Sequence, residues 1–215
     1  MHAKPDLRVV LKMEDRWFGL RNRGRYPTTH MAPIDYNDLA KGVCDGLRSA
    51  FSNLIAANTD QTFYTFAIWT DDSLQFANPC ANTEEGLEST VERYRREVDP
   101  EYNTTSTPNG MRWSYGDWKF FPIDDEDYLS DVNSALSDNF NADEEIFEQQ
   151  IEPLWQALLD GFKQLNDEGF FGVDDERTKI TLLVVGDLPS EIVDHCATVL
   201  NPKDTADKYI NWNYG

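Results

Sequence analysis

Residue types that commonly carry catalysis or bind metals are few in this sequence, and their spacing suits neither role. The histidines are His2, His30 and His195, so the two histidines four residues apart that a zinc-binding helix requires are absent. His195 directly precedes Cys196, and neighbouring residues on a helix point to different faces, so these two form no nucleophile–base pair. A glycine-rich phosphate loop and a Gly-x-Ser-x-Gly motif are also absent. The sequence therefore predicts no catalytic residue, no metal site and no cofactor.

Carboxylates are the one chemically active group that the chain has in excess. It contains 39 acidic and 19 basic residues, which gives a formal net charge of −20. Between Phe120 and Phe162 there are twelve acids and no lysine or arginine. A calcium-binding EF-hand loop starting at Asn139 is excluded, because Glu144 stands where the loop needs glycine and Gln150 where it needs glutamate. Such a run of acids is typical of a solvent-exposed face.

This charge restricts the partners that the protein can bind. A strongly negative surface repels the phosphates of DNA and RNA, so we expect no nucleic-acid binding. The same surface attracts a basic protein and speeds the encounter with it. The candidate partner-binding residues are Asp124, Asp125, Glu126, Asp127, Asp131, Asp143, Glu144, Glu145 and Glu148. Two alternatives stay open: the acidity serves only the solubility of a housekeeping interaction protein, or it reflects a salt-adapted host.

A second candidate site lies in an aromatic block just before the acidic stretch. Its residues Trp113, Tyr115 and Trp118 could line a ligand groove, because aromatic faces suit sugars and flat rings. The protein would then be an enzyme or a small-ligand binder. The alternative is that these rings cover the central sheet, where large aromatic side chains contribute much of the burial.

The cysteines and the hydropathy pattern lead us to expect a cytoplasmic protein. Cys44, Cys80 and Cys196 are odd in number and far apart, which fits buried free thiols better than disulfides or zinc ligands. No run of about 18 apolar residues could span a membrane, and the N-terminus lacks the apolar core of a secretory signal. We therefore expect no membrane association.

Helical and strand patterns follow one another along the chain and predict an α/β (α+β) fold. The helices expected from apolar residues at helical spacing cover 35–58, 82–98, 125–138, 143–150, 153–167 and 190–200. The expected strands cover 61–70, 74–79 and 178–185. The first two strands are close enough to form an antiparallel hairpin. We therefore expect a mixed central β-sheet, including this hairpin, packed against several α-helices.

Local signals predict where several helices begin. Asp35 or Asn37 caps the first helix, and Asn82 with Glu85 forms a capping pair for the second. Ser190 caps the helix that follows the last strand.

Two further features concern the second half of the chain. Proline suits the first turn of a helix and breaks its interior, so Pro153 predicts a break near Glu152. The aromatic tail 209–215 either docks on the domain or stays free of it.

Residues 1–31 differ in composition from the rest of the chain. They contain seven basic and three acidic residues and show no amphipathic period. We expect a basic N-terminal extension, or a start codon assigned too early; the alternative is an edge strand over 7–11. Residues 32–215 then form a single acidic α/β domain.

Four local patterns occur in order along the chain. They are NTEEGLE at 82–88, RWSYGDW at 112–118, GFFG at 169–172 followed by Arg177, and a final pattern with Asp187, Ala197 and Leu200-Asn201-Pro202. Together they resemble a bacterial family known only as a domain of unknown function, numbered 4303. The likeness spans roughly residues 35–202, and Cys196 stands where the family pattern has serine.

The resemblance implies a partner class but no established activity. Similar small proteins are associated with polymorphic toxin systems as candidate immunity proteins. The partner implied in this way is the basic nuclease domain of a toxin, which an acidic protein could cover.

Overall fold

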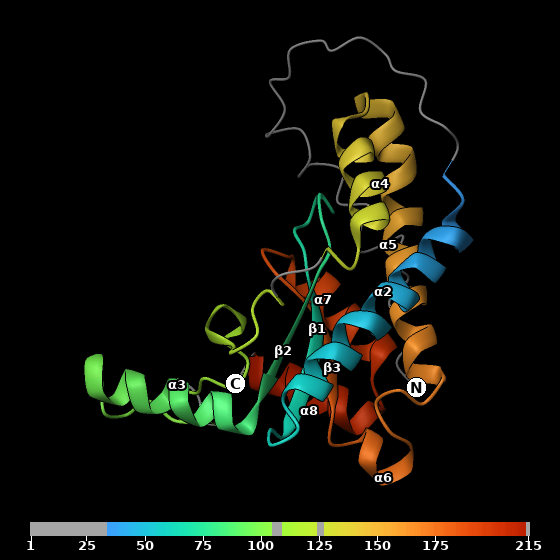
Figure 1. The fold of residues 1–215 in the computed structure, drawn as a ribbon. Coiled ribbons are helices and arrows are strands. Elements are labelled where there is room, and N and C mark those ends of the chain that lie inside the picture. Colours follow the sequence, from blue (N-terminus) through green and yellow to red (C-terminus); the bar gives the residue numbers. More distant parts are fainter. Residues whose placement is uncertain (1–33, 105–108, 124–126, 214–215) are drawn as a thin grey trace.

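A three-stranded mixed sheet lies at the centre of the computed structural model, which describes residues 34–104, 109–123 and 127–213 (Figure 1). Strand β1 (Phe63–Trp69) pairs antiparallel with β2 (Asn78–Thr83) and parallel with β3 (Thr181–Val185). The order β2-β1-β3 places β1 in the middle. The predicted α+β fold, with a mixed sheet that includes a hairpin, is confirmed.

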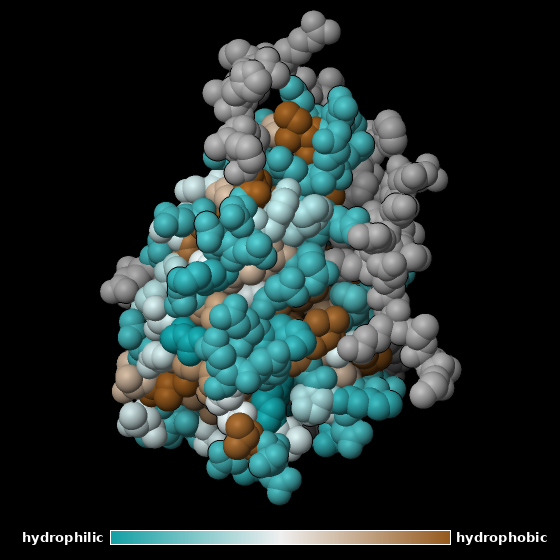
Figure 2. All heavy atoms as spheres, turned by 90° about the vertical axis from the view of Figure 1, so that its right-hand side faces the viewer, coloured by the Kyte–Doolittle hydropathy of each residue, from teal (hydrophilic) through white to brown (hydrophobic). Residues whose placement is uncertain are grey.

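The main core fills one face of the sheet. Alternate residues of the central strands, among them Phe66 and Ile68, point toward α2 (Tyr36–Ala57), α4 (Ser130–Asn141) and α5 (Glu144–Asp167). The capping prediction at Asp35 is confirmed, because its carboxylate accepts hydrogen bonds from the backbone of Asn37 at 2.9 Å and Asp38 at 3.2 Å. Seen from the side of α2 and α5, hydrophilic residues cover most of the visible described surface (Figure 2).

A smaller core fills the opposite face. Ala67, Leu183 and Val185 pack there against Trp118 and against residues of α7 (Ser190–Leu200) and α8 (Lys203–Asn213). Helix α8 contains most of the C-terminal tail, and the 6% exposure of Tyr209 shows that this part of the tail docks.

A bulge in β1 gives α3 (Glu84–Glu97) its own contact with the sheet. The strand register shifts between Phe63 and Thr65, and Tyr64 belongs to a third cluster with Leu87 and Val91 of α3. Figure 1 shows α3 extending away from α2 and α5.

Two capping predictions are wrong because their helices start differently. Strand β2 lies later than residues 74–79 and includes Asn82, which is buried and donates to the Tyr64 hydroxyl at 3.0 Å. Thr83 therefore caps α3, accepting from the backbone of Gly86 at 3.0 Å. Helix α7 has Pro189 at its N-cap, and Ser190 makes no capping hydrogen bond.

The predicted break near Glu152 is also wrong, because α5 continues through Pro153 as one helix. Proline removes one backbone donor and costs about 3 kcal/mol in a helix interior. Buried side chains on both sides of it, including Ile151 and Leu154, pack into the same core and offset that loss.

Candidate functional site

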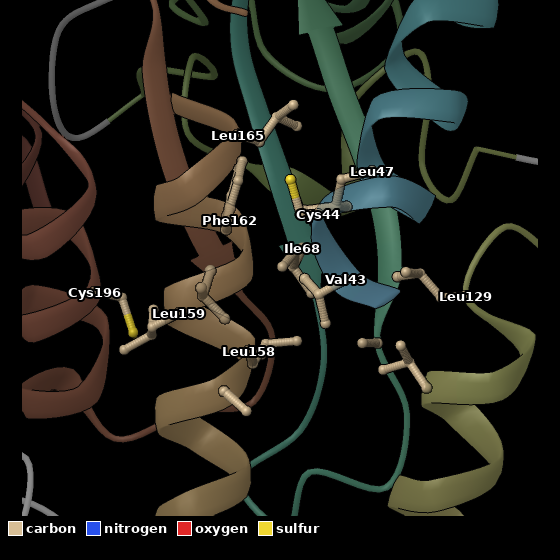
Figure 3. Close-up of a cluster of buried hydrophobic side chains, with 14 of the residues drawn as sticks. Val43, Cys44, Leu47, Ile68, Leu129, Leu158, Leu159, Phe162, Leu165 and Cys196 are labelled. Carbon is tan, nitrogen blue, oxygen red and sulfur yellow. The ribbon is translucent and has the colours of Figure 1, made fainter. Parts of the chain in front are cut away.

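The three thiols have the environment of structural residues. Cys44, Cys80 and Cys196 are buried and free, as predicted. Figure 3 shows Cys44 and Cys196 within the cluster of buried hydrophobic side chains. Burial raises the pKa of each thiol, that of Cys196 to about 12. These thiols are therefore protonated at neutral pH and unsuited to nucleophilic catalysis.

Two members of the predicted ligand groove pack against other parts of the fold, Trp118 as a buried and Trp113 as a partly buried side chain. The indole N–H of Trp118 donates to the Arg112 carbonyl at 3.1 Å, and this side chain is 5% exposed. The Trp113 ring contacts the rings of Tyr64 and Tyr209, with centroid distances of 5.6 and 5.3 Å. Tyr115, on the short 3₁₀ helix η2 (Tyr115–Asp117), packs against the same smaller core and also belongs to a cluster of partly exposed rings.

That cluster, together with nearby carboxylates, lies at the carboxyl ends of the parallel strands. The ring centroids of Trp69 are 4.7 Å from Phe76 and 4.9 Å from Phe121, and Phe121 is 5.6 Å from Tyr115. All four rings are partly exposed. We call these rings, with the acids of the adjoining loops, the aromatic–carboxylate surface.

The acids of this surface are Asp71, Asp72 and Asp187, from two loops far apart in the sequence. Trp69 lies opposite Val185 in the sheet, and the backbone N–H of Thr70 donates to the Val185 carbonyl at 3.0 Å. Gly186 has φ +147°, and a Cβ there would lie 1.7 Å from the Thr70 carbonyl oxygen, so only glycine permits this approach.

The carboxylates influence one another at this edge. Burial raises the pKa of Asp72, and the charges of Asp71 and Asp187 raise it further. Burial also raises the pKa of Tyr115, with a smaller contribution from Asp187. The described part of the chain has no group of three or more His, Cys, Asp or Glu placed to hold a metal ion.

The acidic stretch forms a second surface on a helical hairpin. Helices α4 and α5 pack side by side, and Figure 1 shows them extending beyond the sheet. The described candidate residues are all exposed: Asp127, Asp131, Asp143, Glu144, Glu145 and Glu148. Asp138 of α4, which the sequence analysis did not select, is exposed beside them. Asp124, Asp125 and Glu126 lie outside the described residues. We call the seven described residues the acidic hairpin.

The acidic hairpin has no counter-ions among the described residues. Seven ion pairs join residues of the described ranges, and none of them includes an acid of the hairpin. Asp131, Glu144 and Glu145 lie in first helical turns, where the helix dipole favours negative charge. Asp138 lies in the last turn of α4, where the dipole disfavours it. Stabilisation of the helix ends therefore does not explain the positions of all seven acids of the acidic hairpin.

The fold and these two surfaces define a small acidic α+β domain. The chain belongs to the family described as a domain of unknown function (DUF4303), whose model matches residues 45–202. No curated protein and no solved structure matches it. No helix in the described ranges is long and apolar enough to cross a membrane.

The first two patterns behind the family resemblance meet in space. Arg112 of the second pattern forms an ion pair with Glu84 of the first at 2.6 Å. The side chain of Asn82 accepts from the backbone of Lys119 at 3.2 Å. These contacts join the end of β2 and the start of α3 to the segment 112–119, so the residues that make them have structural roles.

Proposed function

We propose that this protein is a non-enzymatic binding protein whose acidic hairpin recognises a basic surface on another protein. The observation that carries the proposal is the set of exposed carboxylates on and beside two adjacent helices, none of which has a counter-ion among the described residues. Opposite potentials speed encounter and suppress wrong partners.

The uneven distribution of charge favours a specific partner over general solubility. Elsewhere in the described chain some acids pair with bases, as Lys41 does with Asp45 and Lys163 with Asp167, whereas the acids of the hairpin lie in a stretch without lysine or arginine. Concentrating like charges destabilises a compact fold through self-repulsion. Solubility alone would be served equally well by acids spread over the surface.

The partner class that we propose is the nuclease domain of a toxin, which makes this chain a candidate bacterial immunity protein. A nuclease needs a basic surface to hold phosphate groups, and the acidic hairpin has the opposite charge. We place the complex in the cytoplasm, in line with the buried free thiols.

The test compares two variants with the same net charge. The hairpin variant carries Asp138→Lys, Asp143→Lys, Glu145→Lys and Glu148→Lys. The control variant reverses four exposed acids elsewhere, with Asp60→Lys, Glu88→Lys, Glu92→Lys and Glu101→Lys. Each tagged protein is used to capture partners from its own cells at low salt, followed by a salt step and identification of the eluate.

We expect wild type and the control variant to capture one basic protein that elutes with salt, and the hairpin variant to lose it. Circular dichroism checks that both variants fold. Equal capture by the two variants would contradict the proposal, because the position of the charges would then be irrelevant. The absence of any salt-eluted basic protein from wild type would also contradict it.

A further inference from the structure

We propose that the aromatic–carboxylate surface binds the guanidinium group of an arginine side chain that the basic partner presents. This inference rests on the proposed function for the source of the arginine. The site itself is separate from the acidic hairpin and is tested separately below.

The rings of this surface offer the apolar part of such a site. The Trp69 ring contacts both Phe76 and Phe121, and Tyr115 continues the row through Phe121. Their partial exposure leaves aromatic surface that the fold does not bury. A cation within about 6 Å of such a ring is attracted by its quadrupole, and the attraction increases when water is excluded.

The carboxylates offer the charged part. Asp187 is exposed, and one oxygen of Asp72 accepts from the Ser73 hydroxyl at 3.2 Å. Asp71 has a structural role, because its carboxylate accepts from the backbone of Gln75 at 2.9 Å. None of the three takes part in an ion pair with the described residues. The surface therefore combines aromatic faces with negative charge that is partly removed from water.

Among cations, guanidinium fits this combination best. It is planar and weakly hydrated, so it stacks on aromatic rings while its N–H groups donate to carboxylates. A bare metal ion needs several oxygen ligands converging on one point, and the described residues provide no such group. A lysine ammonium is compact and strongly hydrated, so it loses more on entering an aromatic environment.

The position of the surface allows one partner to reach both acidic regions. The backbone of Ala77, at the end of the β1–β2 loop, donates to the side chain of Asn133 on α4 at 2.7 Å. Figure 1 shows this loop at the same end of the sheet as the hairpin formed by α4 and α5. A basic protein held by the hairpin can therefore place an arginine on the rings.

The experiment uses a small probe and needs no partner. N-acetyl-arginine amide is titrated into the ¹⁵N-labelled full chain, and chemical shifts of the Trp69 indole and the 71–72 and 186–187 amides are followed. N-acetyl-citrulline amide, which has nearly the same shape without the charge, is the control probe. We expect saturable shifts with arginine at about millimolar Kd, as one side chain provides, and none with citrulline.

Three variants decide whether the probe binds where proposed. Asp187→Asn and Asp72→Asn should each weaken arginine binding about threefold to fivefold, the size expected for one partly exposed charge pair. The hairpin variant should bind the probe as wild type does. Equal shifts with citrulline, or full affinity in both asparagine variants, would overturn the inference. Probe binding without a captured partner would instead contradict only the proposed function.

Discussion

Single polar side chains, buried or partly buried, join segments that lie far apart in the sequence. Arg177 is 8% exposed and donates to the side chain of Asn166 and to the carbonyls of Ile180 and Leu200. Asn201 bonds both backbone groups of Leu182, at 2.8 and 2.7 Å. Burial lowers the pKa of Arg177 to about 10, so it keeps its charge at neutral pH. Both residues belong to the patterns that resemble the family, and both have structural roles here.

Replacing Asp72 with asparagine should weaken arginine binding but stabilise the folded protein. Its folded-state pKa lies above the ordinary value of 3.8, mainly because of burial. The folded protein therefore holds this proton more tightly than the unfolded chain, so the stabilising contribution grows as pH falls and is lost as pH rises through the folded-state pKa. Asp72→Asn should stabilise the protein at pH 7 by a few tenths of a kcal/mol, since solvent screens a half-exposed group.

Urea unfolding of wild type and Asp72→Asn at pH 7 and at pH 4 measures this effect. The advantage of the variant should shrink at the lower pH, where a larger fraction of the wild-type carboxyl is protonated. A destabilised variant at pH 7 would show that the ionised carboxylate makes favourable contacts that outweigh its burial.

At the scale of elements, the contact between α2 and α5 organises the main core. The two helices approach closely at Gly161 of α5, where a Cβ would lie 2.3 Å from the Ala40 carbonyl oxygen and 2.7 Å from the Val43 Cβ. Because one obstacle is backbone, a side-chain rotation cannot relieve the contact.

Gly161→Ala should destabilise the protein although alanine favours helices. The propensity gain is at most about 1 kcal/mol, and the forced separation of the helices costs about 1–3 kcal/mol or more. We expect a net loss of about 1–2 kcal/mol, measured by chemical unfolding. Gly116→Ala is the matched control, because nothing lies within 4 Å of its Cβ position, and its effect should stay within about 0.5 kcal/mol. Similar stability of the two variants would argue against tight packing at Gly161.

At the scale of the whole molecule, excess negative charge acts on stability as well as on binding. The net charge of −20 produces repulsion in the folded state, and salt screens it. The screening matters most where like charges are crowded without bases, as on the acidic hairpin.

Raising NaCl from 20 to 500 mM should therefore raise the Tm of wild type by about 2–4 °C, equivalent to about 1 kcal/mol for a domain of this size. The hairpin variant and the control variant have the same net charge. Any difference between their salt responses is therefore due to the positions of the reversed charges. The hairpin variant should respond less to salt in differential scanning calorimetry. Identical responses would mean that the repulsion is spread over the whole surface.

The sequence by itself determined the class of fold, most of its elements and the acidic character of one surface. Apolar spacing predicted α2, β1, β3 and α7 to within a few residues of their observed bounds, because burial of one face leaves a period in the chain. Capping residues and proline predicted the helix boundaries less well. They reflect local preferences, which tertiary packing overrode at Pro153 and at the start of α3.

Only the tertiary structure decided which loops share a surface. The parallel pairing of β1 with β3 joins residues such as Thr65 and Thr181, which are 116 positions apart, and so brings Asp72 beside Asp187. The spacing of apolar residues shows that a strand is buried. It does not show which other strand pairs with its edge. That choice depends on how the helices between the strands pack, which no local pattern contains.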